Sequence, residues 1–572
     1  MEKKILLLTA YVIALVLVLV ACGDNSSDGN ANNDGTEDNH TIDLSDSPFA
    51  EFGLDANMRF VEPRTITVSL WDRGNERIPN FDESYWATWV AQEILEAHNI
   101  IVEWHTVPRW TESDFYSTGL AAQTAPDVSY TFNNSLVTSF AEMGGIHNMY
   151  PLLERYGTLL PHMYNLLGEH NVYWNFNPET DELWSIAGRF FQDGRVLTFI
   201  REDWLNTLGL PEPTTLEEFE ATLIAFRDNA ADLVDDPNEL VPFGLTGDVG
   251  WDASLLFESF IPNDVTEREW FVRGFSDRHF MHEEAMREGA RVLNRWFNED
   301  LLWNDFVIAE PPVLHDLIRL GNVGSFIQNW DVPFRPADGW ISGMRENVGS
   351  EANFIPIAPF LNDAGEIRKF MPGSIDRFIF FPTTNNQELA SLLYLDFMSR
   401  PAVLDFLQFG FEGVHHEVID DGVISSLSES DDNPWPDYQV VPSLRNFDLT
   451  LMVNGIHFFD TDPRRAELTL AAGYPGIEPE AILAARNLGL DNAQRFRNVQ
   501  IRVIESEEGM STPLRAEFDV LLHQLIVTTS PENFDAEFNT RYQQWLNLGA
   551  AAIMSERDQA WIETYGDIDT RP

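Results

Sequence analysis

The sequence predicts an α/β protein of two lobes, each built on a parallel sheet with helices on its faces. Residues 65–70 alternate apolar and polar side chains, as a strand with one buried face does. Apolar residues at helical spacing follow in 86–97. β-rich runs at 100–107 and 126–130 then flank a shorter helix at 115–122. Strands that alternate with helices in this way are typical of a parallel sheet.

The same order recurs downstream of this first block. An apolar strand is expected at 196–200, and Thr215 with Glu218 forms a capping box that starts a helix. Further elements are expected as strands at 241–245, 323–328 and 378–381 and as a helix at 386–398. Two lobes, with the chain crossing between them more than once, fit this order better than one large sheet. In such lobes, ligands bind beyond the carboxyl ends of the strands.

The N-terminus has the layout of a signal peptide. Lys3 and Lys4 precede an apolar stretch at 5–20, which is slightly short for a membrane span of roughly 20 apolar residues. The stretch ends in Leu-Val-Ala-Cys-Gly at 19–23, which resembles the lipobox of bacterial lipoproteins. The resemblance implies removal of signal peptide 1–21 and a lipid on Cys22, and two acyl chains there would anchor the protein stably. The alternative is an uncleaved signal anchor, and both interpretations place the rest of the chain outside the cell.

Composition limits what the exported part can do. Cys22 is the only cysteine among 572 residues, so that part has no internal disulfide and no thiol chemistry. Residues 22–58 are expected to form a flexible acidic linker, because their polar composition cannot offset the entropy of ordering. The remainder, in a chain that is 44% hydrophobic, is long enough for two packed domains.

The charged residues argue against a nucleic acid partner and indicate the kind of surroundings that the domain meets. The net charge of −56 repels phosphate backbones, so no nucleic acid partner is expected. Lys369 is the single lysine after the signal peptide. Arginine stays charged at a pH where lysine, with a pKa of about 10.4, begins to lose its charge. We therefore hypothesise that the domain meets alkaline or saline surroundings directly.

Several motifs from about residue 60 to the C-terminus together indicate a family. They are Pro126-Asp127-Val128, the run 199–205, Leu208-Gly209-Leu210, the run 213–219, Ala225-Phe226, Asp236-Pro237-Asn238, Phe354-Ile355-Pro356 with Pro359, the run 409–415, and a helix at 542–548 followed by Gly549. Their order and spacing resemble family 1 extracellular solute-binding proteins, and most closely the large lipoprotein branch of that family.

The resemblance implies a type II periplasmic-binding-protein fold, with a hinge and an interlobe cleft that closes on an oligosaccharide. The lobe boundaries expected on this basis are 59–188 for the first part of lobe 1, 189–373 for the first part of lobe 2, 374–415 for the second part of lobe 1, and 416–572 for the remainder of lobe 2 with the C-terminal helices. Members of the family hand sugars to a membrane permease powered by a cytoplasmic ATPase, and they have no catalytic activity.

The chain departs from the family at one point. The large branch often carries a calcium loop after the Asp-Pro pair, whereas here Asp235–Glu239 runs straight into an apolar segment. Calcium needs six to eight oxygen ligands, and this loop looks too short to supply them. No metal and no cofactor are therefore expected.

Candidate ligand-binding residues follow from the chemistry of sugars, which present flat apolar faces ringed by hydroxyls. Aromatic and polar side chains near strand ends and expected crossovers are the candidates. They are Trp71, Asp72, Arg73, Asn133, Asn134, Arg189, Asp248, Trp251, Gln328, Asn329, Trp330, Asp331, Glu412 and His415.

Some of these assignments have competing interpretations. Most of the 17 tryptophans must be core residues, and Trp86 and Trp89 are assigned to the core. The arginines at 73, 189 and 201 are either cleft residues or structural ion-pair partners. If two of them line the cleft, a sugar that contains uronic acid is favoured as the ligand, because arginine binds carboxylates in a bidentate manner.

Signals of catalysis are weak, and no catalytic residue is expected. With 92 acidic residues, paired carboxylates carry no information. The sequence has no nucleophile elbow, zinc-protease helix motif or glycine-rich phosphate loop. His279 and His282 beside Glu283 are expected to be exposed helix residues rather than metal ligands. Adjacent His415 and His416 would point to opposite faces of a strand and could not chelate together.

The sequence therefore predicts a monomeric, lipid-anchored carbohydrate-binding protein on the extracellular face of the cytoplasmic membrane. Its expected partners are an oligosaccharide and the permease subunits of an ABC transporter. The alternatives are a cell-surface glycan-degrading enzyme and a sensor protein that presents a ligand to a signalling receptor.

Overall fold

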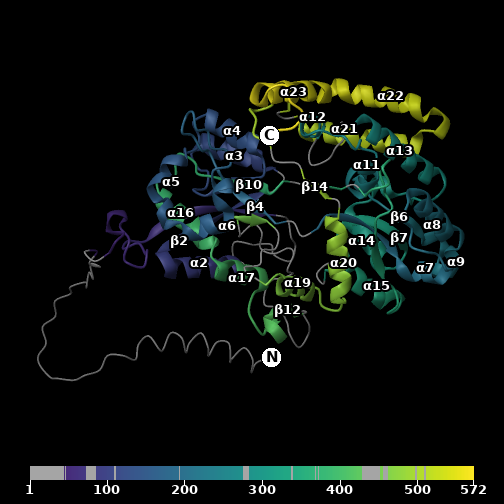
Figure 1. Ribbon diagram of the computed structural model, residues 1–572, viewed down its shortest axis with the longest axis horizontal. Helices are drawn as coiled ribbons and strands as arrows, with labels where there is room; N and C mark the ends of the chain where they lie inside the picture. Colours follow the sequence, from purple (N-terminus) through teal and green to yellow (C-terminus); the bar gives the residue numbers. More distant parts are fainter. Residues whose placement is uncertain are drawn as a thin grey trace, which may run out of the picture. The chain divides into compact units, whose positions relative to one another are not determined.

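The computed structural model describes most of the chain beyond the expected linker (Figure 1). The described residues are 44, 47–72, 85–108, 111–191, 194–274, 282–335, 339–367, 369–371, 373–427, 451–454, 462–491, 493–495, 499–507 and 510–571. The expected signal peptide, Cys22, most of the linker and Arg73 lie outside them. The chain divides into a unit of residues 1–57, in which Ala50–Phe52 forms a 3-10 turn, and a compact unit of residues 58–572. Among the described residues, no helix has the length and apolarity to cross a membrane.

The first sheet joins strands that are far apart in the sequence. Its strands are, in spatial order, β2 (Ile100–Pro108), β1 (Arg64–Asp72), β3 (Ser129–Thr131), β10 (Ile375–Phe380), β4 (Ile186–Phe190) and β13 (Val453–Asn454). β1 is parallel to β2, and a parallel bridge between Val68 and Val128 links β1 to β3. β10 runs antiparallel to β3 and β4, while β13 is parallel to β4.

Helices surround the first sheet, and α16 lies at the centre of their packing (Figure 1). They are α2 (Tyr85–His98), α3 (Glu112–Ala122), α4 (Asn134–Glu142), α5 (Tyr150–Tyr156), α6 (Pro161–Val172), α16 (Glu388–Met398) and α17 (Pro401–Phe409). Trp86 is fully buried, as expected of a core residue. Trp89 is only half-buried and stacks on Phe406 with ring centroids 3.8 Å apart, so its assignment to the core is wrong.

The second sheet has four strands. They are, in spatial order, β6 (Val241–Gly244), β7 (Val323–Asn329), β5 (Val196–Arg201) and β8 (Phe354–Ile357). β6 and β7 are parallel, and β5 runs antiparallel to β7 and β8. All six residues of β5 are buried, because the sheet has an apolar core on each face. Val196 and Ile200 contribute to one core cluster, and Leu197 and Phe199 to the other.

Helices cover both faces of the second sheet (Figure 1). They are α7 (Glu202–Leu208), α8 (Leu216–Asp228), α9 (Ala230–Leu233), α10 (Val249–Asp252), α11 (Ser254–Ser259), α12 (Glu267–Arg273), α13 (Glu283–Asn298), α14 (Pro311–Arg319), α15 (Trp340–Val348), α19 (Pro463–Ala472), α20 (Pro479–Leu490), α21 (Ser511–His523), α22 (Phe534–Trp545) and α23 (Ala551–Tyr565). The predicted capping box starts α8, where the Thr215 hydroxyl accepts a hydrogen bond from the Glu218 N–H at 3.2 Å.

By the described strands, the chain passes between the two sheets three times. It leaves the first sheet after β4, returns at β10 and leaves again after β13. Short strands lie outside the two main sheets: β9 (Lys369–Met371) pairs with β14 (Ala493–Arg495), and β11 (His416–Val418) pairs with β12 (Ile424–Ser426). The two sheets, each with its own helices, agree with the predicted two lobes.

Two expectations need correction. The sequence assigns residues 416–572 to the second lobe, but Val453 and Asn454 form β13 of the first sheet. A two-residue strand has no periodicity by which a sequence could reveal it. His282 was expected to be exposed, yet its side chain is buried at the start of α13, near the Trp270 ring.

Candidate ligand-binding site

The described candidates at 71, 72, 133, 134 and 189 lie near one edge of the first sheet, where β1, β3 and β4 end. Because β10 runs antiparallel, its first residues lie at that same edge, with Ile375 opposite Arg189 and Arg377 opposite Gly188. This is the carboxyl edge of the parallel strands, at which ligands bind in open α/β sheets.

A cluster of three aromatic rings and one guanidinium occupies this edge. The Trp71 ring stacks on Tyr130 with centroids 5.3 Å apart and meets Phe132 edge-on at 4.8 Å. The Arg377 guanidinium carbon lies 5.6 Å from the Tyr130 centroid and 5.3 Å from the Phe132 centroid. Both distances allow cation–π attraction. Of these residues, Trp71 is predicted from the sequence, whereas Phe132 and Arg377 are not.

Burial decides which of these groups a ligand can reach. Trp71 is 3% exposed, and Tyr130 and Arg377 are fully buried. Phe132 is half-buried. Trp71 therefore supports the cluster from within, and Phe132 is the ring with an accessible face.

Among the polar candidates beside this cluster, Asn133 has a structural role. The exposed Asn133 caps α4, where its side-chain oxygen accepts the Ser135 N–H at 3.0 Å, and Asn134 is the first residue of that helix. Asp72 is the last residue of β1, while Arg73 lies outside the described residues.

The described contacts of Arg189 and Arg201 are structural. The half-buried Arg189 donates a hydrogen bond to the Leu166 carbonyl at 3.4 Å and lies over the Phe191 ring at 4.5 Å. Arg201 is buried and binds both carboxylate oxygens of Asp203, at 2.8 and 2.7 Å. Arg201 is therefore a structural ion-pair partner.

In the second lobe, the polar candidates follow the end of β7. Gln328 and Asn329 are half-buried, and the Gln328 side-chain oxygen accepts the Asn329 N–H at 2.9 Å. Trp330 is only 6% exposed. Its ring packs on Gly194 of the first crossing segment so closely that a Cβ at residue 194 would overlap it. Asp331 is buried too and receives two hydrogen bonds at 2.9 Å from Arg335.

The remaining two candidates of this lobe follow β6. Asp248 forms an ion pair with Arg515 at 3.4 Å, with both side chains well exposed. Trp251 is half-buried and packs against the larger core cluster. The buried carboxylate of this region belongs to Asp252, which accepts hydrogen bonds from the N–H and hydroxyl of Thr246 at 2.6 and 2.7 Å.

The candidates at 412 and 415 lie in the loop after α17. Glu412 is exposed, whereas His415 is 1% exposed and its Nδ1 accepts the Phe411 N–H at 3.0 Å. Burial, with a smaller contribution from neighbouring His416, lowers the pKa of His415 to about 4, so the ring is neutral at pH 7. His415, which the sequence offers as a ligand contact, therefore fixes this loop from inside.

Metal ligands are not grouped anywhere in the described part of the chain, where no set of three or more His, Cys, Asp or Glu side chains is arranged to hold an ion. The loop at Asp235–Glu239 forms a 3-10 turn at 237–239. The Asp236 carboxylate caps it by accepting the Asn238 N–H at 3.0 Å.

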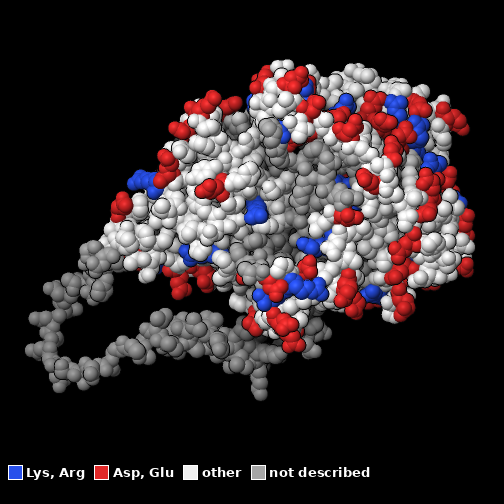
Figure 2. All heavy atoms as spheres, viewed as in Figure 1, with Lys and Arg blue, Asp and Glu red and all other residues white. Residues whose placement is uncertain are grey.

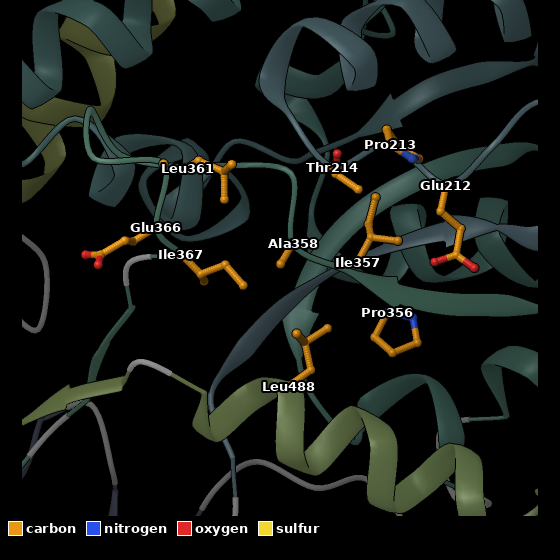
Figure 3. A pocket seen from close by; sticks show the side chains of 11 residues that line it. Glu212, Pro213, Thr214, Pro356, Ile357, Ala358, Leu361, Glu366, Ile367 and Leu488 are labelled. Atoms are coloured by element: carbon orange, nitrogen blue, oxygen red, sulfur yellow. The ribbon is translucent and has the colours of Figure 1, made fainter.

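A pocket of about 510 Å³ opens in the second lobe (Figure 3). It is lined by Glu212, Pro213, Thr214, Pro356, Ile357, Ala358, Leu361, Gly365, Glu366, Ile367 and Leu488. Aliphatic and proline side chains form most of its walls, with carboxylates at 212 and 366. The sequence analysis did not identify this pocket, because its walls come from three segments that only the fold brings together.

Comparisons with known proteins agree on the fold. No family model matches this chain. Lipoprotein LipO of Bacillus subtilis (strain 168) is 25% identical over 245 residues, which are 41% of this chain and 47% of LipO, so the match spans about half the length of that relative.

Solved structures match over most of the chain. The alginate-binding protein AlgQ2, in a crystal structure without calcium ion, has a TM-score of 0.61 at 18% identity, covering 87% of this chain and 98% of AlgQ2. The S. pneumoniae ABC-transporter substrate-binding protein FusA, in complex with kestose, has a TM-score of 0.62 at 13% identity, covering 87% of this chain and 99% of FusA. An HMO-binding, ABC-transporter-associated solute-binding protein from Bifidobacterium longum infantis ATCC 15697 has a TM-score of 0.57 at 15% identity, covering 87% of this chain and 99% of that one. These structures confirm the predicted fold class.

Proposed function

We propose that this chain, which has the two-lobed fold of ABC-transporter solute-binding proteins, captures oligosaccharides by cleft closure and delivers them to the permease of an ABC importer. The observation that carries the proposal is the fold, which is similar over 87% of the chain to AlgQ2 and to kestose-bound FusA. AlgQ2 is an alginate-binding protein, and FusA was solved in complex with kestose.

The chemistry at the sheet edges supports a sugar as the ligand. Phe132 offers an apolar face on a ring that Trp71 and Arg377 hold in place. The amides of Gln328 and Asn329 lie in the other lobe at the end of β7. Rigid support of this kind lowers the entropy lost on binding.

The surface charge is compatible with a neutral sugar. Acidic side chains predominate on the face seen in Figure 2, in keeping with the net charge of −56. A ligand without charge is not repelled by such a surface. A polyanion would be repelled electrostatically unless arginine side chains faced it.

The lipid anchor is a separate part of the proposal. The lipobox-like sequence ending at Cys22 supports it, as does the similarity to a lipoprotein, LipO. A lipid on Cys22 would hold the protein at the extracellular face of the cytoplasmic membrane. Mass spectrometry of the protein from membranes should detect a diacylglyceryl group at Cys22. An unmodified thiol at Cys22 would contradict the proposed lipid anchor.

The binding experiment is a thermal-shift screen of the purified protein against kestose, alginate oligosaccharides and human milk oligosaccharides. A ligand that binds only the folded state raises its stability by about 2.7 kcal/mol at one hundred times its Kd, which gives a clear rise in Tm. Calorimetry then measures affinity. No binding across a broad oligosaccharide panel would contradict the proposal.

The same samples separate binding from catalysis. Chromatography of the sugar after prolonged incubation should recover it unchanged, because the proposed role breaks no covalent bond. Release of shorter sugars would instead favour the alternative of a cell-surface glycan-degrading enzyme.

A further inference from the structure

A buried cluster of charged side chains lies where the first two of the three segments that cross between the lobes meet. Arg195 ends the first crossing segment, immediately before β5. Its Nε donates a hydrogen bond to the Phe370 carbonyl at 2.6 Å, and its Nη2 forms an ion pair with Glu258 at 3.0 Å. Phe370 belongs to β9, on the segment that returns to the first sheet, and its N–H donates to the other oxygen of the Glu258 carboxylate at 3.3 Å. Arg195 and Glu258 therefore tie the two crossing segments together.

Lys369 ties the returning segment to α20. Its side chain is 1% exposed. The ammonium Nζ donates to the Leu488 carbonyl and, at 3.3 Å, to the Asp491 carbonyl. These carbonyls lie at the C-terminal end of α20, where the last carbonyls of a helix lack intrahelical partners and the helix dipole favours a cation. A compact ammonium suits two converging carbonyls better than a planar guanidinium does.

The end of α20 also packs directly on the first crossing segment. A Cβ at Gly489 would lie 2.9 Å from the Arg195 backbone nitrogen, so only glycine allows this approach. In addition, β9 pairs in parallel with β14, the strand after α20. Both crossing segments and the end of α20 thus form one packed block on the second lobe.

We propose that Lys369 is a positioning residue for ligand capture. Together with Arg195 and Glu258, it holds the first two crossing segments against the second lobe. We call this set of contacts the clamp, and its closed state becomes more stable as the pH rises. This proposal depends on the proposed function in one respect: the clamped segments form the hinge about which the cleft closes. The clamp itself is a property of the protein without ligand.

The direction of the pH effect follows from the burial of the amine. The charged groups that face Lys369 are Asp491 beyond α20, Glu258 on α11 and Arg195 on the first crossing segment. Burial outweighs the attraction of the two carboxylates, Arg195 adds repulsion, and the pKa of Lys369 falls from its ordinary 10.5 to about 8. An opened clamp exposes the amine to water and restores the ordinary pKa, so protonation favours opening and loss of the proton favours the clamp. Between these two values, the clamp equilibrium should shift by up to about tenfold per pH unit.

The test measures lobe motion without ligand. In the full chain with Cys22→Ser, cysteines introduced at exposed Ser135 on α4 and exposed Glu217 on α8 carry a FRET pair across the lobes. The distribution of transfer efficiencies should narrow as the pH rises from about 8 to 10.5. Lys369→Met keeps the stem but removes the donor, and it should give a broad distribution with no pH response. Arg464→Met removes an exposed positive charge from α19 and should behave as the unsubstituted protein does.

A FRET distribution that stays constant over this pH range, or a Lys369→Met protein that follows the unsubstituted one, would overturn the clamp. Should Lys369→Met fail to fold, amide hydrogen exchange of residues 369–371 in the unsubstituted protein decides. After correction for intrinsic rates, protection must rise with pH, and constant protection would refute the proposal. Failure of kestose and the other sugars to bind, with the FRET response intact, would remove the proposed function and leave the clamp standing.

Discussion

Replacing Lys369 by methionine should change how the stability of the protein depends on pH. In the folded protein, burial holds the pKa of Lys369 at about 8, against an ordinary value of 10.5 in the unfolded chain. The unfolded state therefore binds more protons between these values, and the free energy of unfolding rises with pH across that window. This contribution is fully present above pH 10.5 and is lost as the pH falls through 8.

The magnitude follows from the shift in pKa. At about 1.36 kcal/mol per pKa unit, the lysine makes the unsubstituted protein gain on the order of 3 kcal/mol relative to Lys369→Met between pH 8 and 10.5. The side chain is almost fully buried, so screening by water reduces this figure little. Below pH 8, the difference between the two proteins should be constant, because Lys369 is then charged in both the folded and the unfolded state.

Denaturant unfolding monitored by tryptophan fluorescence, at about pH 7.5, 9 and 10.5, measures the effect. Arg464→Met serves as the control for loss of one positive charge, because its side chain is 61% exposed. A difference between the unsubstituted protein and Lys369→Met that is the same at all three pH values would refute the reasoning. So would a difference that moves in the opposite direction.

Three further outcomes are expected. Phe132→Ala should weaken sugar binding by about tenfold at a nearly unchanged Tm, because the ring is half-buried; unchanged affinity in calorimetry would remove Phe132 from the site. Trp330→Ala should lower the free energy of unfolding by roughly 3–5 kcal/mol, because the ring is nearly fully buried; a native Tm would contradict its packing role. His415→Gln should reduce the loss of stability in acid, because the folded pKa of His415 is about 4 against an ordinary 6.5, so that its contribution is present above pH 6.5 and lost as the pH falls through 4. Equal losses between these pH values in urea unfolding of both proteins would contradict the last prediction.

The elements that the sequence revealed are those with local signals. The alternation at 65–70 lies within β1, the apolar run at 196–200 lies within β5, and the capping box at Thr215 starts α8. Each signal depends on residues a few positions apart, because strand alternation and helix capping are local properties of the backbone. The two-lobed class follows from their order.

The roles of the tryptophans could not be read in this way. Trp71 and Trp330 both lie at strand ends, where aromatic side chains were expected to contact a sugar. Each is instead covered by residues distant in sequence. Tyr130 stacks on Trp71, while Gly194 and Tyr474 pack against Trp330. Whether a large ring at a strand end is a platform or a support depends on these partners, and a sequence alone does not place them.

Arg377 had a signal that could have been used. It lies in the run Ile375–Phe380, directly after Asp376 and before three apolar residues, and only the last part of the run was assigned to a strand. A charge inside a buried strand needs compensating neighbours, so such a residue marks a site or a structural cluster. The same logic would have identified Lys369, the one lysine in a domain that otherwise uses arginine.

One candidate binding residue of the second lobe packs directly on the first crossing segment. Trp330 follows β7 at the carboxyl edge of the second sheet, and its ring packs on Gly194, one residue before Arg195 of the clamp. A ligand that moves the end of β7 therefore acts directly on the first crossing segment. Phe132 has no such link through the described contacts of its ring, which stay within the first lobe. A change at Phe132 should alter affinity alone, whereas a change at Trp330 should alter affinity and lobe motion together, and the FRET pair at residues 135 and 217 distinguishes the two.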